Sequence, residues 1–168
     1  MTAVGLISDT HGILDPRVFE YFKDCDEIWH AGDFGSVELS DQLAAFKPLK
    51  GVFGNIDDHA LRKIHPLDNW FTCEQVSVWI THIGGYPEHY SPRVKQQLTL
   101  KAPDLFICGH SHILRVMRDK RYGNMLTMNP GAAGHHGFHK IRTLLRFKID
   151  KTSILDAEVI ELGTRGSQ

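Results

Sequence analysis

Seven side chains of the kinds that bind divalent metals follow five short apolar runs of this 168-residue chain. Two are carboxylates, one is an amide and four are imidazoles: Asp9, His11, Asp33, Asn55, His82, His110 and His112. Oxygen and imidazole donors without thiolate suit Mn²⁺, Fe²⁺, Zn²⁺ or Ni²⁺ rather than a structural zinc site made of cysteines. Seven protein ligands are more than one small ion can bind if one of its coordination positions must stay open for substrate or water. They suit two ions about 3.5–4 Å apart that share one carboxylate.

The charge of such a site indicates what it would attract. Two divalent ions bring four positive charges, and only Asp9 and Asp33 in the set are anions, so a filled site keeps an excess of about two positive charges. An anionic phosphate would offset that excess. A chain with a formal net charge of −1 can therefore hold an anion-attracting pocket without a cluster of Lys and Arg.

Strand ends explain how donors so far apart in the sequence could meet. Buried strands are predicted where the chain is apolar, at 3–8, 27–31, 49–53, 71–80 and 105–108. One or two of the seven donors follow each run. Because the carboxyl ends of parallel strands converge on one edge of a sheet, where ligands bind, we expect the donors to lie together there.

Capping signals predict helices between the strands. They begin at Asp15-Pro16, at Ser36 and at Ser91-Pro92; the second ends before Pro48 and the third near Leu100. Two hairpins follow, 113–120 with 125–128 and 141–149 with 153–162, and the tail 163–168 is expected to be frayed. The pattern predicts an α/β chain whose sheet starts with parallel βαβ units and ends with antiparallel hairpins, in one layered domain over residues 1–168.

Composition excludes several classes of protein. The length fits one domain, and no apolar run approaches the roughly 18 residues that a membrane span needs. The N-terminus lacks the basic region of a signal peptide, so a cytoplasmic location is expected. A pI of about 6.8 argues against stable nucleic-acid binding. The three cysteines, Cys25, Cys73 and Cys108, are too far apart to form a disulfide framework or a zinc knuckle.

Five motifs, in order along the chain, resemble the signature blocks of the calcineurin-like metallophosphoesterases. They are Asp9-Thr10-His11-Gly12, Gly32-Asp33, Gly54-Asn55, Thr81-His82 and Gly109-His110-Ser111-His112. Together with Asn129-Pro130-Gly131, their spelling is similar to the small YfcE-type phosphodiesterase branch. Each block alone is a weak signal, but five in order are specific.

This resemblance implies the metallo-dependent phosphatase fold, a four-layer α/β/β/α sandwich, with a dinuclear centre. In the family pattern Asp9, His11 and His112 hold one ion, Asn55, His82 and His110 hold the other, and Asp33 bridges them. A metal-bridging hydroxide then attacks the phosphorus of a small-molecule or nucleotide phosphoester, with Asn55 and His82 also counted as catalytic. Two Mn²⁺ ions are favoured, and Ni²⁺, Fe²⁺ or Zn²⁺ also fit.

The histidines outside the seven predicted metal ligands can each be interpreted in two ways. Larger family members carry a leaving-group acid directly after the Asn of the third block, where this chain has Ile56. His59 is a candidate substitute, although a surface position is favoured. His30 is expected to be buried and hydrogen-bonded within a strand. For His135, His136 and His139 solvent exposure is favoured over a loop that faces the substrate.

An alternative function is a non-catalytic protein-binding scaffold of the same fold, like the small retromer subunit, whose metal ligands are degraded. The presence of all seven donors favours the enzyme. The substrate, the native metal and the oligomeric state stay open, a homo-oligomer included. Substrate specificity is expected from the loops at 57–69, 84–91 and 133–140.

Overall fold

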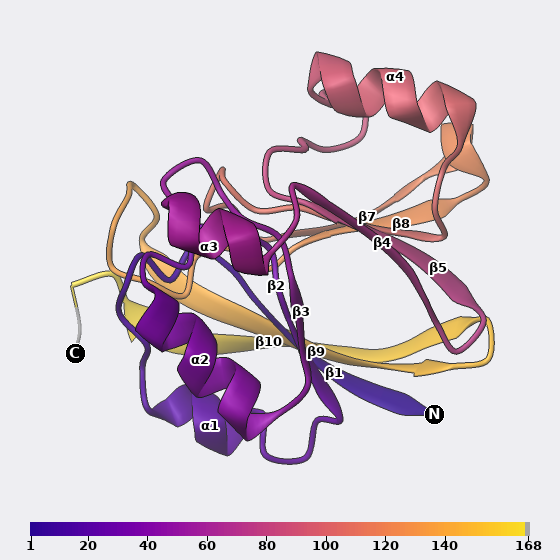
Figure 1. Ribbon diagram of the computed structural model, residues 1–168. Helices are drawn as coiled ribbons and strands as arrows, with labels where there is room; N and C mark the ends of the chain where they lie inside the picture. The colour runs from indigo at the N-terminus through magenta and orange to yellow at the C-terminus, as the bar shows by residue number, and fades with distance from the viewer. Residues whose placement is uncertain (167–168) are drawn as a thin grey trace.

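Two five-stranded sheets pack face to face in the computed structural model, which describes residues 1–166 (Figure 1). The first sheet has the order β10-β9-β1-β2-β3, made of β10 (Ser153–Thr164), β9 (Ile141–Asp150), β1 (Thr2–Ile7), β2 (Glu27–His30) and β3 (Leu49–Gly51). The second has the order β4-β5-β6-β8-β7, made of β4 (Asp68–Cys73), β5 (Val76–Thr81), β6 (Leu105–Ile107), β8 (Met125–Asn129) and β7 (Arg115–Asp119).

Helices cover the outer face of each sheet. Three helices lie on the first sheet: α1 (Arg17–Tyr21), α2 (Val37–Phe46) and α3 (His59–Ile64). One helix, α4 (Pro92–Leu100), lies on the second sheet, and a short 3₁₀ turn, η1 (Lys120–Tyr122), joins β7 to β8. The expected four-layer α/β/β/α sandwich is therefore confirmed. Among the described helices, none is long and apolar enough to cross a membrane.

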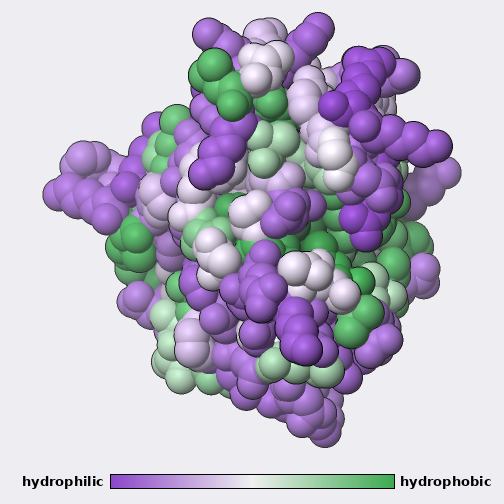
Figure 2. All heavy atoms as spheres, turned by 90° about the vertical axis from the view of Figure 1, so that its right-hand side faces the viewer, coloured by the Kyte–Doolittle hydropathy of each residue, from purple (hydrophilic) through white to green (hydrophobic). Residues whose placement is uncertain are grey.

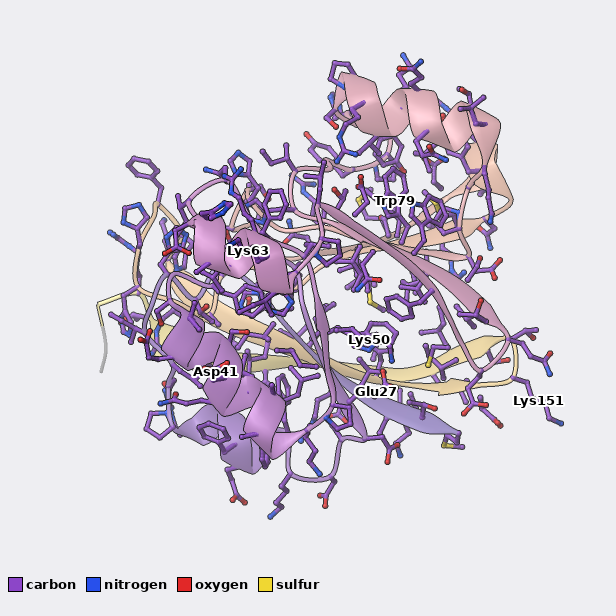
Figure 3. All side chains as sticks on the ribbon, in the orientation of Figure 1. Glu27, Asp41, Lys50, Lys63, Trp79 and Lys151 are labelled. Atoms are coloured by element: carbon purple, nitrogen blue, oxygen red, sulfur yellow. The ribbon has the colours of Figure 1, made fainter. Side chains whose placement is uncertain are left out.

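The core forms because side chains alternate along each strand. Leu6 of β1 packs between the two sheets, whereas the next residue, Ile7, packs under the helices of the first sheet. In β6 all three residues are buried, with Phe106 facing α4 and its neighbours facing the other sheet. Trp79 of β5 lies beneath α4 (Figure 3). Central strands buried on both faces explain the continuous apolar runs in the sequence.

Parallel strands form one side of the first sheet and the middle of the second. β1, β2 and β3 are parallel in the first sheet, and β5, β6 and β8 in the second. The hairpin β9–β10 pairs antiparallel with β1, with Leu6 opposite Leu145, whereas β7 pairs antiparallel with β8. The sequence pattern predicts one sheet, and this is wrong, because β4 to β8 form a second sheet of their own.

Local signals set most element boundaries. Ser36 and Ser91 accept hydrogen bonds from the backbone N–H of Leu39 and Val94, which confirms both predicted caps. The first helix begins at Arg17 rather than at Asp15, although the Asp15 carboxylate accepts from the Arg17 N–H.

Two predictions of irregular structure are wrong. The expected loop 57–69 contains α3, whose N-cap is Asp58, and the start of β4. In the tail that was expected to fray, Gly163 and Thr164 belong to β10, and residues 167–168 lie outside the described part of the chain.

The two ends of the sandwich differ in character. The loops after β1, β2, β5 and β6 lie toward the left of Figure 1, with the orange loop 131–140 beside them. Figure 2 shows the opposite end, where hydrophilic side chains surround apolar ones at the middle of the face. Glu27 and Lys50, labelled in Figure 3, form an ion pair of 2.6 Å across β2 and β3.

Candidate metal centre

Two clusters of metal-binding side chains form where the strand-end loops meet. One contains Asp9, His11 and His112, and the other Asp33, His82 and His110; within each cluster the donor atoms lie within 4.8 Å of one another. The seventh predicted donor, Asn55, joins the second cluster because its Oδ1 lies 3.0 Å from His110 Nδ1. The structure thus brings together all seven residues that the sequence analysis selected.

Asp33 lies between the two clusters. Its Oδ2 is 3.4 Å from Nε2 of His11 in the first cluster and 3.2 Å from Nε2 of His82 in the second. Asp9 lies deeper in the first cluster, with Oδ1 3.1 Å from His112 Nε2. A carboxylate within reach of both clusters has the position that a bridging ligand between two cations requires.

Buried donors without partners show that the clusters fit cations. Within residues 1–166, Asp9 Oδ1, His11 Nε2 and His82 Nε2 are buried and make no hydrogen bond. A buried polar atom without a partner costs about 1–3 kcal/mol. Three such atoms at one place are explained by divalent cations, which would accept the lone pairs of carboxylate and imidazole.

The remaining atoms of these side chains are held by hydrogen bonds that aim the free atoms at the clusters. His82 Nδ1 lies 2.7 Å from the Ala31 carbonyl oxygen, which can only accept, so Nδ1 carries the proton and Nε2 is left as the donor to a metal. Asp9 Oδ2 accepts from the Ser8 hydroxyl at 2.6 Å and from the His110 backbone N–H at 3.2 Å, which leaves Oδ1 free.

The backbone at these loops is strained. Five of the seven donor residues have a left-handed backbone: Asp9, His11, Asp33, His110 and His112 have φ between 49° and 68°. Residues other than glycine seldom adopt this conformation, and each instance costs about 1–3 kcal/mol. The surrounding fold holds these residues in the left-handed conformation. This conformation directs their side chains at the strand ends toward one another.

Two glycines of the motifs are required because neighbouring side chains lie too close to leave room for a Cβ atom. A Cβ at Gly54, just before Asn55, would lie 2.0 Å from Oδ1 of Asp33. A Cβ at Gly109, just before His110, would lie 2.3 Å from the Ser8 hydroxyl oxygen and 2.7 Å from Asp9 Oδ2. Any side chain at either glycine would displace a carboxylate of the clusters.

Charge within the clusters favours an ionised Asp9. Burial raises the pKa of Asp9, but the nearby imidazoles of His11 and His112 lower it by more, so its pKa falls below the usual range. Burial lowers the pKa of His82, whereas the close approach of Asp33 Oδ2, at 3.2 Å, and the charge of Asp9 raise it above its usual value. Cation binding would therefore compete with protons on the imidazoles.

A further residue, Asp57, holds the site together and was missed by the sequence analysis. Its buried carboxylate accepts backbone N–H groups from Phe34 at 3.2 Å, Gly35 at 2.9 Å and Gly54 at 2.8 Å. It thereby ties the loop that carries Asp33 to the loop that carries Asn55. The one available signal was its position two residues after Asn55, in a segment interpreted as a loop.

Two of the other histidines lie where the favoured interpretation put them. His30 is fully buried, with Nε2 3.1 Å from the Thr10 hydroxyl and Nδ1 accepting from the Gly32 N–H, which confirms the prediction. His59 is exposed at the first residue of α3. Within residues 1–166 it has no hydrogen bond, ion pair or ring contact with either cluster.

The loop with His135, His136 and His139 is closer to the clusters than expected. His136 is exposed, but its ring lies 4.7 Å from the ring of His11. His139 is half-buried, its ring lies 5.0 Å from that of His112, and its Nε2 donates to the Gly134 carbonyl oxygen at 2.8 Å. His135 is also half-buried, and its Nδ1 donates to the Arg165 carbonyl oxygen at 2.6 Å. The expected solvent exposure is therefore wrong for His139, which packs against the first cluster, and for His135, which packs against the chain at Arg165.

Comparisons with known proteins agree with this geometry. Residues 2–152 match the model of the calcineurin-like phosphoesterase superfamily domain. A probable metallophosphoesterase of Methanothermobacter thermautotrophicus is 29% identical over 167 residues, which cover 95% of this chain and 92% of the relative.

Solved structures share the fold. An archaeal phosphodiesterase superposes with a TM-score of 0.75 at 21% identity, covering 95% of this chain and 99% of the other. Vps29 of Chaetomium thermophilum also has a TM-score of 0.75, at 16% identity, covering 98% and 99%. At these identities the likeness concerns the fold alone.

Proposed function

Because the chain belongs to the calcineurin-like phosphoesterase superfamily, we propose that it is a dinuclear metal-dependent hydrolase of phosphoric esters, and specifically a phosphodiesterase. One observation supports this most strongly: Asp33 Oδ2 lies between His11 Nε2 and His82 Nε2, two buried atoms of different clusters that have no hydrogen-bond partner within residues 1–166. The proposed activity belongs to one domain over residues 1–168, and a cytoplasmic location stays a prediction.

Each cluster would hold one divalent cation, Mn²⁺ by preference. Asp9, His11 and His112 would bind the first, Asn55, His82 and His110 the second, and Asp33 both. Two such cations supply an ionised water as the nucleophile and stabilise the charge on the phosphoryl oxygens. The chain itself contributes the positions of the donors and a site in which Asp9, Asp33 and His82 are shielded from bulk water.

Side-chain nucleophiles are disfavoured by the hydrogen bonds around the clusters. The Thr10 hydroxyl is buried, donates to the Phe34 carbonyl oxygen at 2.9 Å and lies 3.1 Å from His30. The Ser111 oxygen accepts from the Ile113 N–H at 3.2 Å and from the Asn129 amide at 3.1 Å. His30 cannot act as a base toward Thr10, because its Nδ1 accepts from the Gly32 N–H and its Nε2 therefore carries the proton. These contacts support direct attack by water.

The position at which larger family members carry the leaving-group acid holds no proton donor in this chain. The position after Asn55 is occupied by Ile56, whose side chain is exposed and apolar. General acid catalysis contributes roughly 10²–10⁴-fold when departure is difficult. We therefore expect phosphodiesters with aryl leaving groups to be hydrolysed much faster than those with alkyl groups.

A scaffold without catalysis is the alternative function. Its support is the fold shared with Vps29 structures, one of which, from Entamoeba histolytica, is described as a complex with Zn²⁺. Metal binding alone therefore does not separate the two functions. The convergence of all seven donors favours the enzyme, since a scaffold need not keep every one.

An activity screen tests the proposal. Chelator-treated protein is reconstituted with Mn²⁺, Ni²⁺, Zn²⁺ or Mg²⁺ and assayed on bis(4-nitrophenyl) phosphate and 4-nitrophenyl phosphate. We expect hydrolysis of the diester above the monoester, highest with Mn²⁺, and its loss in Asp33→Asn. Bound metal without hydrolysis of any phosphoester would contradict the enzyme and favour the scaffold.

A further inference from the structure

A groove with a volume of about 510 Å³ begins beside the second cluster, at Asn55 and His82. It runs from the segment after β3 past α3 toward the start of α4. Its other lining residues are Phe53, Gly54, Arg62, Leu67, Ile83, Ser91, Pro92 and Arg93, and we name these ten residues the ester groove. Its volume lies within the range of small-molecule sites, about 300–1,000 Å³.

The lining of the ester groove carries positive charge. It includes two arginines and no acidic residue. Arg93 is neutralised, because its guanidinium lies 2.8 Å from the Asp68 carboxylate and also donates to the Thr81 hydroxyl. Arg62 has no carboxylate within ion-pair distance anywhere in residues 1–166. The positive charge of Arg62 is therefore available to a ligand.

Contacts hold the Arg62 side chain in place. Its Nε donates to the Asp57 carbonyl oxygen at 2.8 Å, and one terminal nitrogen lies 3.4 Å from the carbonyl oxygen of Asn55. The guanidinium carbon is 4.6 Å from the centre of the Phe53 ring. These contacts position the Arg62 guanidinium next to the second cluster. Most of its N–H groups stay free, since a guanidinium has five.

The walls of the ester groove are apolar. Leu67 and Ile83 are 46% and 44% exposed, and Phe53 and Pro92 add further apolar surface. An organic group lying in the groove would cover this surface, with a gain of about 25 cal/mol for each Å² removed from water. Apolar walls with one unpaired guanidinium match a ligand that combines a flat apolar body with an anionic group.

We propose that the ester groove binds one ester group of the substrate, and that this group consists of an aromatic or similarly flat body bearing its own negative charge, paired with Arg62. The inference rests on the proposed function, because it places the reacting phosphate on the two clusters. It assigns specificity for charged aromatic phosphoesters over neutral ones to a single residue of α3. A bidentate guanidinium–carboxylate or guanidinium–phosphate contact would make this pairing directional.

Two phosphonates that cannot be hydrolysed test the assignment by direct binding. 4-Carboxyphenylphosphonate and 4-carbamoylphenylphosphonate have nearly the same shape and differ by one charge. Calorimetry on the Mn²⁺-loaded full-length protein should show the carboxylate binding about tenfold more tightly, the modest factor expected for an ion pair that stays partly exposed. As a second readout, both compounds are measured as competitive inhibitors of diester hydrolysis.

Substitutions at Arg62 separate its charge from its shape. Arg62→Gln should bring the two affinities to within about twofold of each other and leave binding of the carbamoyl compound unchanged, whereas Arg62→Lys should keep part of the preference. Arg118→Gln is the matched control, because Arg118 is also exposed and donates to a backbone carbonyl, that of Asn124. This control should keep the full preference.

The outcomes distinguish the two levels of the proposal. No preference in the wild-type protein, or an equal preference in Arg62→Gln, would overturn the role of the ester groove while leaving the phosphoesterase intact. Failure of both phosphonates to bind, together with no hydrolysis, would instead overturn the proposed function and the inference with it.

Discussion

Replacing Asp57 with alanine should destabilise the protein strongly and weaken the metal centre, although Asp57 contacts neither cluster directly. Its carboxylate accepts three backbone N–H groups, from Phe34, Gly35 and Gly54. The bonds to Phe34 and Gly54 are buried, and each buried donor left without a partner costs about 1–3 kcal/mol. With a smaller contribution from the partly buried Gly35 bond, we expect Asp57→Ala to lower the free energy of unfolding by about 3–5 kcal/mol.

Urea unfolding in the presence of a chelator measures this loss without the contribution of bound metal. Asp58→Ala is the matched control, because the neighbouring carboxylate makes a single, partly buried capping bond, to the Leu61 N–H, which is worth about 1 kcal/mol. Calorimetric titration with Mn²⁺ should show weaker binding in Asp57→Ala and unchanged binding in Asp58→Ala. Equal stability of the two variants would refute the reasoning, since it would mean that the three bonds hold nothing in place.

Three further predictions concern the leaving group, acid stability and the nucleophile. His59→Ala should leave the hydrolysis rates of alkyl and 4-nitrophenyl diesters unchanged, because His59 is exposed and contacts neither cluster; a selective loss with alkyl esters would identify it as the missing acid. Hydrogen bonding from Arg17 and Arg142, opposed by partial burial, holds the pKa of Asp15 below its usual range, so its stabilising effect is present above about pH 4 and is lost as the pH falls below that. Asp15→Asn should accordingly lower the free energy of unfolding at pH 7 by about 2 kcal/mol and reduce its dependence on pH in acid, as measured by denaturation between pH 2 and pH 7. In a single turnover in H₂¹⁸O, one ¹⁸O should enter the phosphate product, whereas a phosphorylated protein would identify a side-chain nucleophile.

Signals that are local in sequence predicted their structures well. The serine caps of α2 and α4 and most apolar runs of the central strands depend on a few neighbouring residues, and the structure contains them. The predicted strand 71–80 is the exception, because the structure divides it into β4 and β5, which pair antiparallel. The convergence of the seven donors was predictable for a related reason. Parallel strands of one sheet bring their carboxyl ends to one edge, and the packing of the two sheets brings the two edges together.

Structure that depends on distant contacts was not predictable in the same way. α3 has only six residues, too few for a helical period to stand out, although Asp58 offered a capping signal. Two of the three partners of Asp57, Phe34 and Gly35, lie on another loop. The rings of His136 and His139 contact loops more than twenty residues away in sequence. The division of the strands into two sheets likewise follows from packing that no local pattern records.

The number of metal ions bound by each chain tests the central claim most directly. Protein reconstituted with excess Mn²⁺, freed of unbound metal and measured by elemental analysis should contain two ions per chain. Asn55→Ala should lose mainly one of them, and Asp33→Ala should lose both or nearly both, because its carboxylate lies within reach of both clusters. One ion or none in the wild-type protein would contradict a dinuclear centre.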